Sequence, residues 1–149
     1  MATEFRLQSI LDFRTKLADR LRLELSALQM RCQEEEGRLD GLRLAEQAAL
    51  TQLATPKDAA LALHDVVQVV DHLDRLRERI AEQAQVVRQL TAEVDRQRER
   101  VLVATQEQKA LEKLRERHLA EAAQAARRLE RVEASEIAML QFRRAGAVS

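Results

Sequence analysis

The chain has 149 residues, 25 basic and 25 acidic side chains, 34% charged residues and 2% aromatic residues. A net charge of zero argues against a general nucleic-acid binder, which would carry a basic face. With three glycines, one proline and few aromatic residues, the composition is also unlike that of a compact globule. It is typical of a coiled coil.

The cysteine content and the N-terminal sequence bear on the cellular compartment of the protein. Cys32 is the lone cysteine, so no internal disulfide can form and a reducing compartment fits. The first residues, MATEFRLQ, lack a basic region followed by an apolar core, so we expect no signal peptide.

A first helix is predicted from about residue 3 to residue 53. From Leu21 onward its apolar residues recur in steps of four and three, which is the heptad seam of a coiled coil. The step from Leu17 to Leu21 is four where three is due, so the pattern predicts a local stutter. Gly37 and Gly41 fall on the side away from this seam.

A turn is predicted at residues 54–57. Thr55, Pro56 and Asp58 have the order of an N-cap, a first-turn proline and a first-turn acid at the start of a second helix. A proline-kinked continuous helix remains an alternative, because no glycine marks a reversal.

A second helix is predicted from about residue 57 to residue 144, since no glycine or proline interrupts this run. If continuous it is roughly 130 Å long. Charges throughout the run exclude a membrane span. Its seam is interrupted by polar residues that can fix helix register: Gln83, Gln97, Gln108, Arg115, His118 and Glu136.

The predicted fold is therefore all-α: one coiled-coil domain over 1–149, in which two long helices form an antiparallel hairpin with a C-terminal helical overhang. A turn centred on Pro56 pairs residues whose numbers add to about 112, such as Cys32 with Ile80. The first helix then ends opposite about Gln108. Beyond it an apolar stripe has no partner in the chain and is expected to bind another protein: Leu111, Leu114, Leu119, Ala122, Ala125, Leu129, Val132 and Met139.

No catalytic, cofactor or metal site is predicted. His64 and His72 are eight residues apart, whereas helical metal ligands are better placed four apart. Cys32 lies on the seam and is interpreted as a small buried apolar residue. The basic cluster from Arg127 to Arg144 suits a helix C-terminus or an acidic partner. A two-helix rod offers no cavity that excludes water, so an enzyme is not expected.

Two stretches, FRLQSILDFRTKLAD and QKALEKLRERHLAEAAQAARRLERVEASEIA, resemble the FliJ family of bacterial flagellar type III export. The helix pattern, the chain length and the Pro56 turn agree with this resemblance. After Leu119 the chain departs from the family, because Ala122, Ala123, Ala125 and Ala126 stand where many members carry an aromatic residue and a Gln/Lys-rich track.

The resemblance implies a non-enzymatic stalk similar to the gamma subunit of rotary ATP synthase. It implies binding to the hexameric flagellar export ATPase, to the cytoplasmic part of the export gate membrane protein and to export chaperones, at the cytoplasmic face of the membrane without insertion into it. The implied ATPase-facing residues are Phe5, Leu7, Leu11, Leu111, Leu114, Arg115, Arg117 and Leu129. The implied gate-facing residues are Arg38, Leu42, His72, Leu76, Arg79 and Gln83, of which Leu42 and Leu76 also fit the seam.

Two alternatives remain open at the level of sequence. One is a homodimeric coiled-coil scaffold in which the overhangs of two copies cover each other. The other is the equivalent stalk of an injectisome-type secretion system. Light scattering on the purified protein tests the first, and the neighbouring genes test the second.

Overall fold

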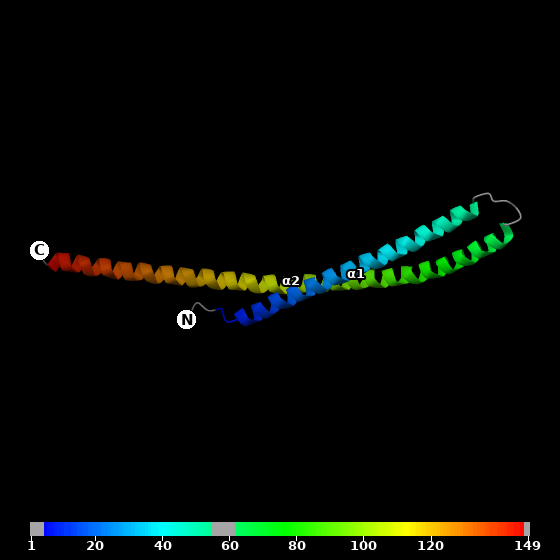
Figure 1. Ribbon diagram of the computed structural model, residues 1–149. Coiled ribbons are helices and arrows are strands. Elements are labelled where there is room, and N and C mark those ends of the chain that lie inside the picture. The colour runs from blue at the N-terminus through cyan, green and yellow to red at the C-terminus, as the bar shows by residue number, and fades with distance from the viewer. Residues whose placement is uncertain (1–4, 55–61, 148–149) are drawn as a thin grey trace. The chain divides into compact units, whose positions relative to one another are not determined.

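The computed structural model describes residues 5–54 and 62–147, and these form two α-helices (Figure 1). Helix α1 runs Gln8–Ala54 and helix α2 runs Ala62–Ala147, 47 and 86 residues respectively. The described residues contain no strand. The prediction of an all-α helical hairpin is confirmed.

The helix ends differ slightly from the expected bounds. Ala54, expected in the turn, is the last residue of α1, while residues 55–61, with the proposed Thr55 cap and Pro56, lie outside the described residues. Asp65 lies in the first turn of α2 and Arg144 in its last turn. Both charges stabilise a helix end, because the helix dipole is positive at the N-terminus and negative at the C-terminus.

The chain divides into two units. Unit 1 contains residues 1–18 and 103–149, and unit 2 contains residues 19–102. Each unit combines a segment of α1 with a segment of α2.

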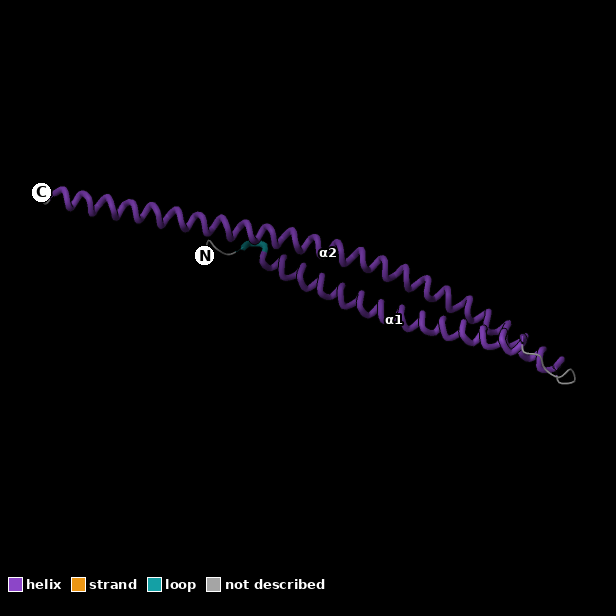
Figure 2. The backbone as a smooth tube through the Cα atoms, turned by 90° about the horizontal axis from the view of Figure 1, so that it is seen from above, coloured by secondary structure: helices purple, strands orange, loops and turns teal. Residues whose placement is uncertain are grey.

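Unit 2 is held together by two apolar clusters between its helices. Near the ends that the turn joins, Ala49 packs with Leu73 and Leu76. Further along, Cys32 packs with Leu90 and Val94. The buried and half-buried residues of α2 in this unit include positions 69, 73, 76, 80, 83, 87, 90, 94 and 97, which recur every three or four positions as the heptad pattern predicts. Figure 2 shows the two helices of this unit side by side over their length.

The register of the helices differs from the prediction. The residue numbers of Glu35 and Gln83 add to 118, and those of Cys32 and Leu90 add to 122. The expected sum of about 112 is wrong because it placed the reversal at Pro56. The helix ends at Ala54 and Ala62 are centred on position 58, which corresponds to a sum of 116 and accounts for part of the difference. Residues of α1 therefore pack against α2 residues roughly two to three turns beyond those expected.

Two glutamines on the α2 seam cross to α1 in the same way. Gln83 donates from Nε2 to the main-chain oxygen of Glu35 at 3.0 Å and to its carboxylate at 2.5 Å. Gln97, which is buried, donates from Nε2 to the main-chain oxygen of Leu21 at 3.1 Å and to the Glu24 carboxylate at 3.2 Å. A buried amide costs stability unless it is hydrogen-bonded, so these contacts favour one register over its neighbours.

In unit 1 the seam continues without the predicted stutter. Ala18 is fully buried and Leu11 is nearly so, whereas Leu17 is only half-buried. Leu11, Arg14 and Ala18 keep the steps of three and four, so the small Ala18 rather than Leu17 occupies the seam. Arg14 also forms an ion pair with Glu107 across the two helices. The predicted stutter is wrong because it counted Leu17 as the seam residue, whereas the neighbouring Ala18 occupies the seam position.

Neither helix contains a stretch, within the residues that the structure describes, that is long and apolar enough to cross a membrane.

Candidate interaction surfaces

The last part of α2 exposes apolar side chains that nothing in the described chain covers. Every residue from 123 to 147 is exposed. In Figures 1 and 2 no other described segment of unit 1 lies beside this part of α2, which Figure 1 draws orange to red. We call its large apolar residues the C-terminal stripe: Leu129, Val132, Ile137, Met139, Leu140 and Phe142.

The C-terminal stripe lies among more basic than acidic residues. Residues 123–147 contain five arginines and three glutamates. Exposed apolar patches of this kind mark protein contacts more often than isolated apolar residues do. The charge balance favours a partner surface with an acidic character.

The covered part of α2 extends further than expected. The rings of Phe5 and His118 lie 5.7 Å apart between centroids, so residues at the start of the chain reach ten positions beyond Gln108. His118 Nε2 and Gln108 Oε1 are buried, and the described residues offer neither atom a hydrogen-bond partner. The covered part of α2 therefore extends past Gln108 to His118, and Ala122 beyond it is still half-buried. The register shift between the helices accounts for this correction.

The eight candidate ATPase-facing residues all belong to unit 1, but they differ in exposure. Leu11 is buried, so it packs within the hairpin. Phe5, Leu7 and Leu111 are half-buried. The remaining four are exposed and accessible to a partner: Leu114, Arg115, Arg117 and Leu129.

The six candidate gate-facing residues all belong to unit 2. Leu76 is buried, and Leu42 packs against the cluster that contains it. Gln83 is half-buried and is occupied by its hydrogen bonds to Glu35. The other three are exposed: Arg38, which pairs with Glu35 at 3.0 Å, His72 and Arg79.

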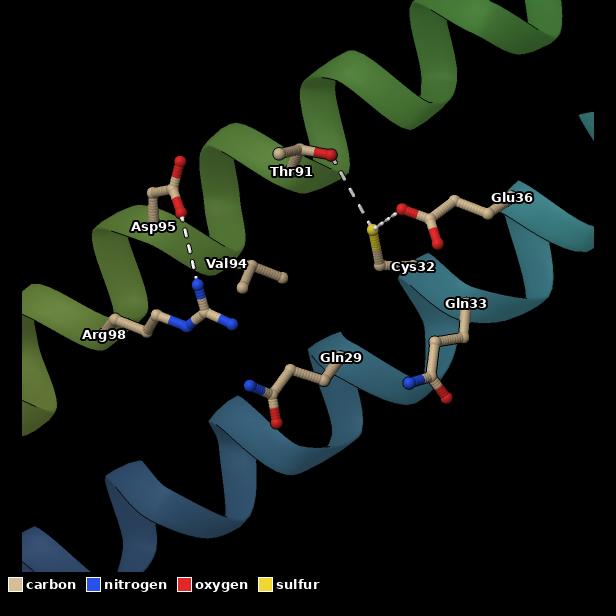
Figure 3. Close-up of a pocket in the computed structure, with 8 residues that line it drawn as sticks. All are labelled: Gln29, Cys32, Gln33, Glu36, Thr91, Val94, Asp95 and Arg98. Atoms are coloured by element: carbon tan, nitrogen blue, oxygen red, sulfur yellow. Dashed lines mark hydrogen bonds and ion pairs between the residues drawn. The ribbon is translucent and has the colours of Figure 1, made fainter.

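An open hollow of about 360 Å³ lies beside Cys32 in unit 2 (Figure 3). The buried thiol contacts Glu36 Oε1 at 3.7 Å and Thr91 Oγ1 at 3.8 Å. The cationic residue among the lining residues is Arg98, which pairs with Asp95 at 3.7 Å. The walls of the hollow are formed by Gln29, Cys32, Gln33, Glu36, Thr91, Val94, Asp95 and Arg98.

The histidines that the sequence brought to attention lie on exposed faces. His64 contacts Gln68 at 3.2 Å and His72 is exposed. Among the described residues, no group of three or more His, Cys, Asp or Glu side chains is arranged to hold a metal ion.

A second exposed apolar surface was missed from the sequence. Leu23, Met30 and Leu44 are 73%, 62% and 67% exposed on the side of α1 away from the seam. The signal is present in the sequence, because these residues are separated by seven or fourteen positions and so lie on one side of a helix.

Comparison with known proteins adds one result. The family profile described as Flagellar FliJ protein matches residues 3–147. No curated protein and no solved structure matches the chain. Because the profile spans both helices and both units, the chain belongs to the FliJ family, whose members are non-catalytic components of flagellar protein export.

Proposed function

We propose that this chain is a non-enzymatic stalk and adaptor that binds the hexameric export ATPase through unit 1. The supporting observation is the exposed C-terminal stripe, whose apolar side chains lie among arginines on one continuous helix. A helix with an exposed apolar face can place that face in a groove of a partner.

The proposed ATPase contact uses exposed residues on α2, above all Leu114 and Leu129. Nearby arginines, including Arg115 and Arg117, would contact acidic groups lining the partner. Leu11 and Leu111 would instead hold the hairpin that presents them. In the same proposal the exposed Arg38, His72 and Arg79 of unit 2 face the export gate, and the chain also escorts export chaperones at the cytoplasmic face of the membrane.

The family match favours a flagellar role over an injectisome stalk, because the matching profile is the flagellar one. A homodimeric scaffold with paired overhangs is less favoured. In a parallel pair, Glu136 and Arg143 occupy seam positions and would each face the same charge on the other copy.

The proposal is tested by mixing the purified chain with the hexameric export ATPase and measuring the mass of the complex by size-exclusion chromatography with light scattering. We expect a complex with the wild-type chain and with Ala134→Asp, because Ala134 lies on the helix face opposite Leu129. Leu129→Asp should weaken the complex at least about tenfold. Absence of a complex with the wild-type chain and an intact hexamer would refute the proposal.

A further inference from the structure

The outer face of α1 carries a second heptad-spaced apolar surface, which we call the outer stripe. It lies entirely in unit 2 and faces away from α2. All of its members are exposed: Leu23, Ala27, Met30, Gly37, Gly41, Leu44 and Ala48. An apolar stripe of this length on a helix already packed on its other side is the pattern of a helix with two partners.

Gly37 and Gly41 indicate that the second partner is another helix. Both lie inside α1, where glycine is a poor helix former. A Cβ added at either position would meet no atom within 4 Å apart from those of its chain neighbours and of the adjoining helix backbone. The chain's own packing therefore does not require them. Two small residues four apart do allow a second helix to approach closely.

The C-terminal stripe of a second copy matches the outer stripe in length and spacing. The outer stripe is about 30 Å long from Leu23 to Leu44, and the C-terminal stripe reaches about the same length when it is extended back to Ala122. The outer stripe recurs in steps of three and four with one interruption at Glu34, and the positions 122, 125, 129, 132 and 139 keep the same steps with one interruption at Glu136. The large side chains of one, such as Leu129 and Val132, suit the small Gly37 and Gly41 of the other.

The charges of the two surfaces are complementary. Residues 19–48 contain seven acidic and five basic side chains, whereas residues 123–147 contain three acidic and five basic ones. The charged residues directly beside the two stripes, which we call their flanks, also have opposite signs at corresponding positions. Asp40 precedes Gly41 and Arg38 follows Gly37, while Arg128 precedes Leu129 and Glu133 follows Val132. Corresponding flanks face each other in an antiparallel helix pair, so the opposed charges attract.

The same flanks disfavour antiparallel pairing of either stripe with itself. Two outer stripes would bring Arg38 against Arg38 and Asp40 against Asp40. Two C-terminal stripes would bring Arg128 against Arg128. Like charges placed directly opposite one another are destabilising.

We infer that the outer stripe of α1 binds the C-terminal stripe of a second copy of this chain as an antiparallel helix pair. This contact goes beyond the proposed ATPase contact and uses the same C-terminal stripe. Self-association and ATPase binding are then mutually exclusive, so a self-associated pool holds the C-terminal stripe covered until the ATPase competes for it.

The test uses two variants that each lack one of the two surfaces. Met30→Asp with Leu44→Asp removes the outer stripe, and Leu129→Asp with Met139→Asp removes the C-terminal stripe. Analytical ultracentrifugation of wild-type chain over a concentration series should show species larger than the monomer. Each double variant alone should remain a monomer, and an equimolar mixture should form a 1:1 complex.

The alternatives give different outcomes. If C-terminal stripes pair with each other, the Met30/Leu44 variant alone still self-associates. If outer stripes pair with each other, the Leu129/Met139 variant alone does so. A monomeric wild-type chain, or a mixture that stays monomeric, overturns the inference. All four positions are exposed, so circular dichroism should show unchanged helix content in both variants.

A charge reversal tests the orientation. Arg128→Glu with Glu133→Arg should weaken self-association about tenfold, and adding Asp40→Arg with Arg38→Glu should restore it. No restoration would contradict the antiparallel pairing.

The ATPase assay separates the two proposals. The Met30/Leu44 variant should still bind the ATPase, because neither residue belongs to the proposed ATPase contact. Loss of self-association with retained ATPase binding supports both proposals. Lack of self-association in the wild-type chain refutes the self-contact alone.

Discussion

The side chain of Gln83 reaches across the hairpin and donates from Nε2 to the main-chain oxygen of Glu35 at 3.0 Å. Gln97, two heptads further along α2, makes the equivalent bond to the main-chain oxygen of Leu21, which lies two heptads earlier in α1. These two equivalent hydrogen bonds fix the register of the helices. Apolar seam layers are similar to one another, so a coiled coil can slip by seven residues, but a glutamine displaced by seven would lose its particular partners.

The register itself is open to a direct test with Cys32. Its sulfur lies 3.8 Å from Thr91 Oγ1, so Thr91→Cys should form an intramolecular disulfide on oxidation. Ile80→Cys, the partner expected from a turn centred on Pro56, should not. Intact-mass measurement after oxidation distinguishes the two, and a disulfide in the Ile80 variant but not the Thr91 variant would contradict the observed register.

Replacing the seam glutamines should separate stability from specificity. Gln97 is 4% exposed, so Gln97→Leu should raise the free energy of unfolding by about 1 kcal/mol in urea denaturation. The double change Gln83→Leu and Gln97→Leu should also permit slippage. In that background Ala84→Cys, seven residues before Thr91, should begin to cross-link with Cys32. Lower stability for Gln97→Leu would mean that the hydrogen bonds outweigh apolar packing.

The helices and their seams were predictable from sequence because both depend on local spacing. Cys32 and Leu76 both fit the predicted seam, and both are buried. The pairing of the helices was not predictable in the same way. Heptad seams match at any shift of seven, and the centre of the reversal depends on backbone geometry that Pro56 alone does not fix.

The candidate surfaces were predictable only in part. The C-terminal stripe followed from the excess length of the second helix. Family resemblance grouped buried residues such as Leu11 and Leu76 with exposed ones such as Arg79, because a motif does not distinguish a residue that holds the hairpin from one that faces a partner. The outer stripe required exposure as well as spacing, since Leu23 and Met30 are apolar residues whose uncovered state only the packing reveals.

Leu76 and Leu129 are leucines on α2 with very different environments. Leu76 is 4% exposed and Leu129 is 64% exposed. Leu76→Asp should lower the free energy of unfolding by more than about 3 kcal/mol, because it buries a charge in an apolar cluster. Leu129→Asp should change it by less than about 0.5 kcal/mol. Urea denaturation of dilute protein measures both, and equal effects would mean that Leu129 is packed within the chain.

Truncation locates the point where the hairpin ends. Removing the residues after Ala122 deletes a segment that is exposed throughout residues 123–147, so the melting temperature of the remaining chain should change little. Removing the residues after Gln108 also deletes the half-buried Leu111 and the ring contact between Phe5 and His118. That truncation should cost about 1–3 kcal/mol of stability.

Both truncated chains should lose ATPase binding, because both lack Leu129. Circular dichroism melts and the light-scattering assay provide the two measurements. If the two truncated chains melt at the same temperature, the contacts made by the residues between Gln108 and Ala122 contribute nothing to the fold. If the chain that ends at Ala122 still binds the ATPase, the C-terminal stripe is not the binding surface.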